Sequence, residues 1–311
     1  MMQLRLRGLG VPTQVIFPEL NWSRMPHPSP SLPSKEARLI ESLRPLRRVI
    51  VAFSGGADSA YLAWAAHRAL GAGALAVTAD SPSFPRSHKR DAEAFTAQFG
   101  IAHEFIATNE FDNPDYVRNS PDRCFHCKDE LFTRLEQFGR ERSIEHIVYG
   151  VNLDDLGDYR PGQNAAQQHH VAAPLADAAL NKAEIRDLSR AAGLPTWDRP
   201  ASACLSSRIP YGTPVTIQNI KTVETGEEEI KALGFRQFRV RFHGEMVRIE
   251  IAPEEMPGAL SIEMAQRLTA IFKPLGFKYV TLDLEGYRQG SLNEVLQLSP
   301  RMAPHTGSPS A

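Results

Sequence analysis

The sequence has few cysteines, no long apolar run and no excess of charge of either sign. Three cysteines among 311 residues argue against a disulfide scaffold and for a reducing compartment, so we expect a cytoplasmic protein. No run of about 18 apolar residues is present, so we expect no membrane-spanning helix. Lys and Arg total 35 and Asp and Glu total 36. A nucleic-acid-coating protein would show a basic excess, so we expect no nucleic-acid partner.

The two ends of the chain differ in composition from its centre. Residues 25–34 (MPHPSPSLPS) are rich in proline and serine and show no periodicity, so we predict a flexible extension over 1–35. The opening residues lack the apolar core and small-residue cleavage site of a signal peptide. Residues 299–311 have a similar composition and are predicted to form a flexible tail.

Between these ends, short β-rich segments alternate with longer helical ones. Strands are predicted over 47–54, 74–80, 103–109 and 146–152, and helices over 60–70, 88–99 and 128–142. A further helix begins after Asn181, with Glu184 in the capping-box position. This alternation predicts an α/β fold, a Rossmann-like parallel sheet with helices on both faces, over 36–210. Ligands of such sheets bind beyond the carboxyl ends of the strands.

The chain from 211 to 298 is predicted to form a smaller α+β domain. Its first helix lies within 216–235, stops at Gly234 and has five apolar side chains that we expect to point inward, namely Ile217, Ile220, Val223, Ile230 and Leu233. A hairpin with its turn at His243–Gly244 follows. A helix over 260–272 and a strand over 278–284 complete the domain.

The segment VAFSGGADSA joins a buried strand to a helix through a glycine-rich turn. Gly55 and Gly56 allow backbone amides to approach a ligand closely, and Ser54 and Ser59 add hydroxyl groups. The start of the helix favours a phosphate. The segment is neither a Walker A loop nor Gly-x-Gly-x-x-Gly. A plain turn in which Asp58 or Ser59 caps the helix fits the local chemistry equally well.

The three cysteines are Cys124 and Cys127, spaced as C-x-x-C, and the distant Cys204. Structural zinc takes four ligands, so a histidine such as His126 or His169 would have to complete a zinc site. Three thiolates without a fourth fit better with a [4Fe–4S] cluster that leaves one iron open to a ligand such as sulfide. Three unlinked core cysteines are a further alternative. The spacing alone leaves all three open.

The SGGADS motif resembles the signature of the PP-loop ATP pyrophosphatases, which include NAD, GMP and asparagine synthetases. Further segments occur in order between about Leu39 and Leu296, namely SPDRCFHCK, DYRPG, ASACLSSRIPYGT, RVRFH and GFKYVTLDLEGYRQGSLNE. Together they resemble the LarE family of ATP-dependent sulfur transferases. Members of that family adenylate the carboxylates of pyridinium-3,5-biscarboxylic acid mononucleotide with release of pyrophosphate, and convert them to thiocarboxylates of the nickel-pincer cofactor.

The resemblance implies an enzyme that uses ATP, Mg²⁺ and a small-molecule mononucleotide substrate, and we expect a homo-oligomer. ATP would be bound by Ser54, Gly55, Gly56, Asp58, Ser59 and Asp80. Asp58 would also be catalytic. Asp80, at the end of the second predicted strand, could equally cap the next helix. Asp158 and Arg160 in DYRPG are weaker candidates, because a Pro-Gly turn explains that segment structurally.

The phosphate of the mononucleotide would be bound by Ser207, Arg208, Arg239 and Arg241. Arg239 and Arg241 alternate on a predicted strand and would form a bidentate clamp from one face. A solvated strand face is the alternative for these two arginines. We expect the substrate between the two predicted domains, beside the cysteines.

LarE enzymes are of two types: one sacrifices a single cysteine as the sulfur donor, and the other holds a [4Fe–4S] cluster on three cysteines. With Cys124, Cys127 and Cys204 as catalytic and cluster-binding residues, this sequence resembles the second type. The position of Cys204 within its segment need not match that of the single-cysteine donor, which also argues against its direct sacrifice. Two other functions stay open, a cluster-dependent PP-loop tRNA thiolase and a zinc-containing nucleotide-binding module. The near-neutral charge argues against the first.

Overall fold

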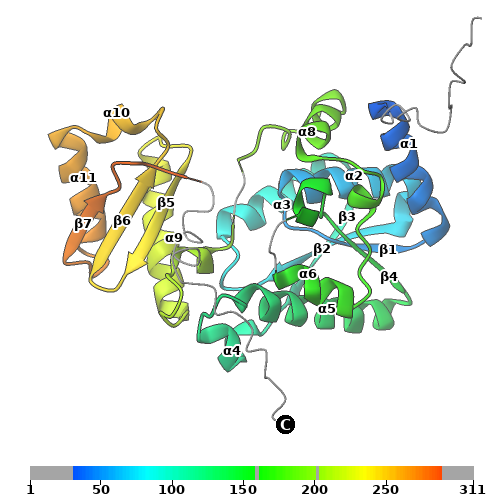
Figure 1. Cartoon of the computed structure of the whole chain (residues 1–311), viewed down its shortest axis with the longest axis horizontal. Helices are drawn as coiled ribbons and strands as arrows, with labels where there is room; N and C mark the ends of the chain where they lie inside the picture. Colours follow the sequence, from blue (N-terminus) through cyan, green and yellow to red (C-terminus); the bar gives the residue numbers. More distant parts are fainter. Residues whose placement is uncertain (1–30, 158–160, 201–202, 289–311) are drawn as a thin grey trace, which may run out of the picture. The chain divides into compact units, whose positions relative to one another are not determined.

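The larger sheet has four strands in the order β3-β2-β1-β4, and every neighbouring pair runs parallel (Figure 1). Its strands are β1 (Val49–Ala52), β2 (Ala74–Asp80), β3 (Ala102–Ala107) and β4 (His146–Tyr149). The computed structural model describes residues 31–157, 161–200 and 203–288. The predicted α/β fold is confirmed, and its strands lie where the sequence pattern placed them.

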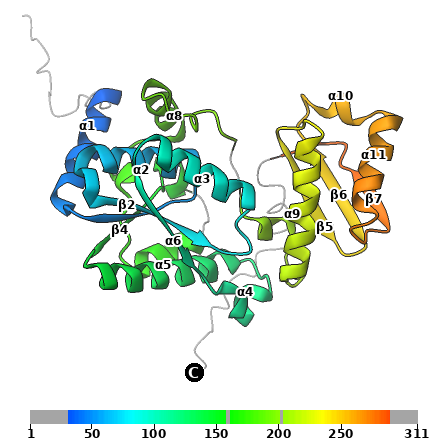
Figure 2. The same ribbon diagram turned by 180° about the vertical axis from the view of Figure 1, so that it is seen from behind.

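Helices cover both faces of this sheet, with α2 and α3 on one face and α5 and α6 on the other (Figures 1 and 2). The helices of this part are α1 (Leu32–Leu43), α2 (Ala57–Leu70), α3 (Arg86–Gln98), α4 (Pro114–Val117), α5 (Arg123–Arg142), α6 (Pro161–Gln168), α7 (Pro174–Asp177) and α8 (Lys182–Ala191). Short 3₁₀ turns include η4 (Glu110–Asp112), η5 (Leu153–Gly157) and η6 (Leu205–Arg208).

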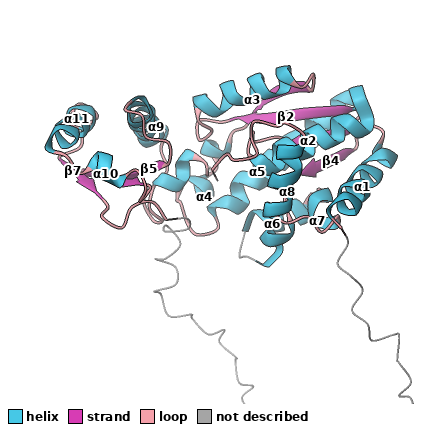
Figure 3. Ribbon diagram, turned by 90° about the horizontal axis from the view of Figure 1, so that it is seen from above, coloured by secondary structure: helices cyan, strands magenta, loops and turns pink. Residues whose placement is uncertain are grey.

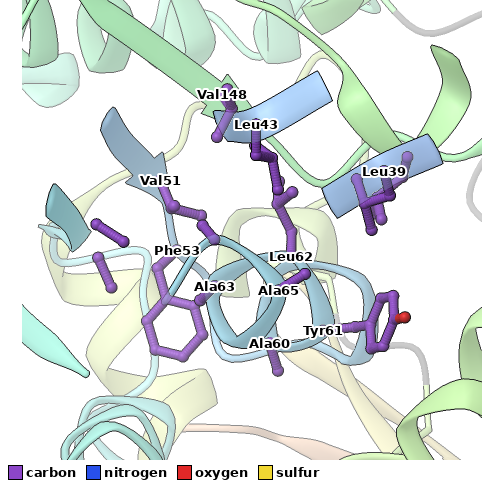
Figure 4. Packing of buried hydrophobic residues seen from close by; sticks show 14 of the residues in the cluster. Leu39, Leu43, Val51, Phe53, Ala60, Tyr61, Leu62, Ala63, Ala65 and Val148 are labelled. Carbon is purple, nitrogen blue, oxygen red and sulfur yellow. The ribbon is translucent and has the colours of Figure 1, made fainter. Parts of the chain in front are cut away.

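Alternate residues of β1 enter two different hydrophobic clusters, because successive side chains of a strand point to opposite faces. Val51 packs in the cluster that contains Leu43 of α1 and Leu62 of α2, and Figure 4 shows these side chains meeting. Ile50 packs on the opposite face with Phe132 of α5. The strand is therefore buried on both sides, as a central parallel strand must be.

Two predicted boundaries are wrong. Leu32–Lys35 were assigned to the flexible extension but form the first turn of α1, where Lys35 makes an ion pair of 2.7 Å with Glu184. Helix α5 begins at Arg123, five residues before the predicted start, so Cys124 and Cys127 lie on a helix and not in a loop. The capping box of Asn181 and Glu184 at the start of α8 is confirmed.

The second sheet has three strands in the order β5-β6-β7, with β5 and β6 antiparallel and β6 and β7 parallel. The strands are β5 (Phe238–His243), β6 (Met246–Ile251) and β7 (Tyr279–Leu282), and the helices are α9 (Ile217–Ala232), α10 (Met256–Ala259) and α11 (Ile262–Phe272). Helices α9 and α11 cover one face of this sheet (Figure 3). The helices and strands predicted for the smaller α+β part are confirmed.

Most of the predicted inward side chains of α9 are buried, and Gly234 follows the helix with a φ of +101°, as its stop signal requires. Ile217 is an exception with 44% exposure, because it is the first helical residue and has exposed neighbours on both sides. The β5–β6 hairpin turns at Gly244, whose φ of +65° favours glycine.

The hydrophobic core of the second sheet extends beyond its own strands and helices. It includes Tyr116 of α4 together with Leu205 and Ile209, and Cys127 of α5 packs against it. From Leu32 onward the chain forms one compact unit. The boundary at residue 210 therefore stays a prediction. No helix among the described residues is long and apolar enough to cross a membrane.

Gly226 in the middle of α9 lies against the buried ring of Phe272, and a Cβ built there would fall 2.4 Å from Cε1 of that ring. The overlap outweighs the higher helix propensity of alanine. We expect Gly226→Ala to lower the free energy of unfolding by about 1–3 kcal/mol, the usual effect of overpacking, as measured by urea denaturation.

Gly258→Ala is the matched control, since the Cβ would meet Phe235 at an ordinary 3.8 Å. It should leave stability unchanged or slightly higher. Equal losses for the two variants would contradict this account of the α9–α11 contact.

Candidate functional site

The turn after β1 presents backbone amides at the start of α2. Gly55 has a φ of +70°, and Gly56 is the extended N-cap of the helix without a side chain to cap it. Ser59 donates to the carbonyl of Gly56 at 3.1 Å and accepts from the amide of Ser54 at 3.3 Å. The serine hydroxyls lie 3.1 Å apart. A helix start whose first amides no side chain caps is suited to bind phosphate.

Two more distant groups fix the backbone of this turn. Arg199 donates to the carbonyl of Gly55 at 2.7 Å and pairs with Asp91 of α3 at 2.6 Å. Gly150, which follows β4, lies so close to α2 that a Cβ there would be 2.8 Å from the amide nitrogen of Ser59. Glycine is required here because the end of β4 and the first turn of α2 are in near contact. The turn lies at the carboxyl end of β1, between β2 on one side and β4 on the other. At this point the strand order reverses, and parallel sheets bind ligands at such positions.

Asp58 is the largely buried carboxylate of this turn. Its Oδ2 makes an ion pair of 2.5 Å with Lys182, the first residue of α8, and its buried Oδ1 has no hydrogen-bond partner within the described residues. Burial raises the pKa of Asp58, and Asp155 adds to the effect while Lys182 opposes it. A buried carboxylate oxygen without a donor is a position at which a bound cation or ligand donor fits. The sequence did not indicate Lys182, although it directly follows the Asn181 cap.

Asp80 lies exposed at the end of β2 and contacts Lys89 of α3. It does not cap α3, whose N-cap is Pro85, so that alternative is wrong. Its proposed approach to adenosine stays a prediction. Asp158 and Arg160 lie outside the described residues.

Cys124 and Cys127 lie one turn apart at the start of α5, and Cys204 directly precedes η6. The pKa of the Cys127 thiol is raised mainly by burial, and the Cys204 and Glu110 side chains raise it further. Cys124 is an exposed residue, but desolvation of its thiol and the Cys204 side chain raise its pKa, whereas Arg123 opposes the shift. The fold therefore brings Cys204 near enough to the C-x-x-C pair to affect the pKa of both of its thiols.

The two histidines that could complete a zinc site both have carboxylate neighbours. Among the described residues, no group of three or more His, Cys, Asp and Glu side chains is arranged to hold one metal ion. His169 contacts Asp129 at 3.0 Å and Glu136 at 2.8 Å, and His126 lies 3.6 Å from Asp122. Each thiolate of a four-iron cluster binds a different iron, so the thiolates need not converge on one point.

The four predicted phosphate-binding residues are brought together, with partners that the sequence did not indicate. Arg208 is buried and pairs with Glu227 of α9 at 2.8 and 3.0 Å, and it also donates to the hydroxyl of Ser207 at 3.0 Å. Arg241 pairs with the fully buried Glu250 of β6 at 3.0 and 2.8 Å and donates to the carbonyl of Ser207 at 2.8 Å. Both charges are therefore compensated inside the protein.

Arg239 has a different environment from its two neighbours. Its guanidinium lies 4.7 Å from the ring centre of Tyr287 and donates to the carbonyl of Phe238 at 2.5 Å. Burial and the charge of Arg208 lower the pKa of Arg239. Arg241 is only 6% exposed, so the alternative of a solvated strand face is wrong.

The sequence also did not indicate a buried hydrogen-bond network beside Cys204. Asn119, Arg123 and Tyr116 bond to the segment of residues 206–213, and Tyr116 lies 2.6 Å from the hydroxyl of Ser206. The signal that could have found Arg123 is its place directly before Cys124 in SPDRCFHCK. Asn119 has no such signal, because asparagine is common in loops.

Comparison with known proteins gives relatives over most of the chain, although no model of a known protein family matches. An uncharacterised protein of Synechocystis sp. is 42% identical over 265 residues, 85% of this chain and 99% of its own. The pyridinium-3,5-bisthiocarboxylic acid mononucleotide synthase of Lactiplantibacillus plantarum is 35% identical over 268 residues, 86% of this chain and 96% of its own. One subunit of the glutamine-hydrolysing GMP synthase of Archaeoglobus fulgidus is 26% identical over 182 residues, 54% of this chain and 55% of its own.

The pairing of Arg241 with Glu250 predicts that these arginines differ in their importance for folding. Arg241→Ala removes one cationic partner of the buried Glu250 carboxylate, which Arg248 also contacts at 3.0 Å. We expect a loss of about 3 kcal/mol of unfolding free energy, at the low end of the range for breaking a buried ion pair. Arg239→Ala should cost about 1 kcal/mol, the net value of an ordinary hydrogen bond.

Urea denaturation of the two variants measures the difference. Glu250→Gln is a useful third variant, because it removes the same pair from the other side and should also destabilise. Comparable losses in Arg241→Ala and Arg239→Ala would contradict the structural role assigned to the Arg241–Glu250 pair.

Proposed function

This chain belongs to the LarE family of ATP-dependent sulfur transferases, and we propose that it inserts sulfur into the carboxylates of pyridinium-3,5-biscarboxylic acid mononucleotide for nickel-pincer cofactor synthesis. One observation carries the proposal beyond the family. The glycine-rich turn with its buried Asp58 and the three interacting thiols occur in one compact unit. The first suits adenylation and the second suits sulfur delivery.

We propose that the turn of residues 54–59 binds the pyrophosphate portion of ATP. The first amides of α2 and the hydroxyls of Ser54 and Ser59 would donate to the phosphate oxygens. The Oδ1 atom of Asp58 would hold Mg²⁺, which screens the charge of the triphosphate. In the reaction a carboxylate oxygen of the substrate bonds to the α-phosphorus while the bond to pyrophosphate breaks. Lys182 would keep Asp58 oriented through their ion pair.

The phosphate of the mononucleotide is assigned to the cluster of Ser207, Arg208, Arg239 and Arg241. The donor groups of three neighbouring guanidiniums, whose planar geometry matches a phosphate, support this assignment. Because Arg208 and Arg241 each bind a carboxylate of the protein, their orientation is set before the substrate arrives. Arg239 is then the guanidinium whose contacts a phosphate would change most.

Cys124, Cys127 and Cys204 would hold a [4Fe–4S] cluster. When bound, such a cluster supplies sulfide at the iron that no protein thiolate ligates. The interacting thiols and the cations Arg123 and Lys128 support this choice. The near-neutral charge of the chain favours a small substrate over tRNA.

We further propose that the enzyme acts in the cytoplasm as a homo-oligomer without a nucleic-acid partner. Three large apolar side chains are exposed around the groove between α11 and β7, namely Leu260, Ile262 and Leu284, at 62%, 82% and 79%. Contiguous exposed apolar surface of this kind is typical of protein contacts. Sedimentation of the purified protein measures the oligomeric state.

Asp58→Asn separates stability from catalysis. Because burial raises the pKa of Asp58, the folded state keeps this proton at a pH where the unfolded chain has released it. The contribution of Asp58 to stability therefore falls as the pH rises from its ordinary pKa of 3.8 through the raised folded value. At pH 7 we expect Asp58→Asn to melt at the same or a higher temperature than the wild type, and to form no AMP or pyrophosphate from ATP.

Calorimetry and product chromatography measure the two effects. Asp187→Asn, which alters an exposed ion pair on α8, is the control and should change neither. ADP and phosphate as the wild-type products would contradict the ATP step. A variant that still makes AMP would show that Asp58 is dispensable.

The cluster hypothesis predicts equal importance for the three cysteines. Replacing Cys124, Cys127 or Cys204 by alanine, one at a time, should remove bound iron, acid-labile sulfide and sulfur transfer while AMP formation continues. Iron and sulfide are counted after anaerobic purification.

The alternatives predict different outcomes. If Cys204 were a sacrificial donor, only its replacement would matter, and the chain would lose the mass of H₂S after one turnover. Zinc without iron in the anaerobic protein would favour the binding module.

A further inference from the structure

Asn119 connects two segments of the chain that lie about 90 residues apart in sequence. Its side chain is completely buried, and its φ of +59° is in the left-handed region. The amide nitrogen donates to the carbonyls of Pro210 and Thr213, both at 2.8 Å, and lies 3.3 Å from that of Ile209. The backbone carbonyl of Asn119 accepts from Gly212 at 3.1 Å. Asparagine suits this position because it tolerates left-handed backbone and carries both donors and an acceptor.

Arg123 continues this network toward the cysteines. Its guanidinium donates to the side-chain oxygen of Asn119 and, at 2.9 Å, to the carbonyl of Ser206. Its charge also opposes the upward shift in the pKa of Cys124, the next residue of α5. Arg123 thus joins the first turn of α5 to the segment that begins at Cys204.

Among the described residues Arg123 has no carboxylate partner, unlike Arg208 and Arg241. The residue is only 2% exposed, and in the described parts of the chain its hydrogen bonds go to uncharged groups. Burial of a guanidinium without an anion is costly, so such a residue is unfavourable for stability alone. Among the described residues, the groups that could compensate its charge are the thiols of Cys204 and Cys124 and the ring of Tyr211, whose centre lies 5.8 Å from the guanidinium.

Other contacts hold different parts of the same segment. The amide of Leu205 donates to the carbonyl of Ser83 at 2.9 Å, and the amide of Val215 donates to that of Val117 at 2.9 Å. These bonds hold the ends of the stretch 205–215. Between them, Asn119 and Arg123 donate to the carbonyls of Ser206, Ile209, Pro210 and Thr213. Arg241 donates to the carbonyl of Ser207, and two backbone amides of the segment donate to those of Ser206 and Pro210.

We propose that Asn119 and Arg123 are positioning residues that hold the Cys204 segment against the first turn of α5, so that the sulfur of Cys204 stays beside those of Cys124 and Cys127. The inference rests on the proposed function, because it assumes that the three sulfurs act together. It adds two residues that touch neither ATP nor the mononucleotide phosphate in that proposal.

The test measures which thiols can be bridged in the metal-free, reduced, full-length chain. Bis(maleimido)ethane links neighbouring thiols, and mass spectrometry of tryptic peptides separates bridges to Cys204 from those between Cys124 and Cys127. Asn119→Gly keeps the left-handed backbone and removes only the side-chain bonds. Arg123→Met keeps an unbranched side chain without the hydrogen bonds.

In the wild type we expect Cys204 bridged to Cys124 or Cys127. Both variants should lower the yield of bridges to Cys204 by at least about tenfold, since each loses several hydrogen bonds to one segment. In Arg123→Met two of the lost bonds have a charged donor. The bridge between Cys124 and Cys127 should be unchanged, because both thiols lie on α5. If Asn119 and Arg123 only stabilised the fold, their replacement would change the yields of both kinds of bridge together.

Ser261→Ala is the control variant, because it removes the N-cap of α11 and lowers stability at a place remote from the cysteines in the sequence. Its bridging pattern should match the wild type. The proposal is overturned if the wild type forms no bridge to Cys204, if both variants keep the wild-type yield, or if Ser261→Ala loses the bridge equally. If Asn119→Gly does not fold, the yield of bridges to Cys204 in Arg123→Met alone tests the proposal. Failure of the wild type to bind iron would overturn the cluster and leave the bridging result valid.

Discussion

Three buried arginines from three different elements hold the irregular segment that carries Cys204, and the geometry of the site depends on them. Arg123 of α5 donates to the carbonyl of Ser206, Arg241 of β5 to that of Ser207, and Arg208 within the segment to those of Ala203 and Cys204. A buried segment without regular structure must satisfy its carbonyls in some other way. Guanidiniums do so here because each carries five donors in a fixed plane.

Charge compensation divides these arginines into two kinds. Arg208 and Arg241 each face a buried carboxylate of α9 or β6, so their ion pairs join the cysteine segment to the second sheet. Arg123 faces thiols in place of carboxylates. The first kind explains how the chain tolerates so much buried positive charge. Arg123 supports the proposal that this place is adapted to sulfur chemistry, because the burial of its charge without a carboxylate lowers stability.

The glycine-rich turn after β1 shows the same conflict between stability and function. Asp58 is buried beside Asp155, with its pKa raised, and only Lys182 opposes that shift strongly. The close approach of Gly150 to α2 leaves little room for the turn to move. A rigid turn with a destabilised carboxylate is suited to bind a cation and phosphates without rearrangement. This geometry supports the proposal that ATP chemistry occurs at the turn.

The sequence by itself determined the features that depend on neighbours within about four residues. The strand at Ala74–Asp80, the capping box of Asn181, the turn at Gly244 and the stop of α9 at Gly234 all follow from local periodicity, hydrogen bonding and φ preferences. The start of α5 was one local feature that the sequence misplaced, because C-x-x-C carries no helix-start signal, and the start of α1 was another. Only the tertiary structure decided the partners. Lys182 reaches Asp58 across 124 residues, and Arg123 reaches Ser206 across 83. Such pairings depend on how the elements pack, and no local pattern encodes which buried charge will meet which partner.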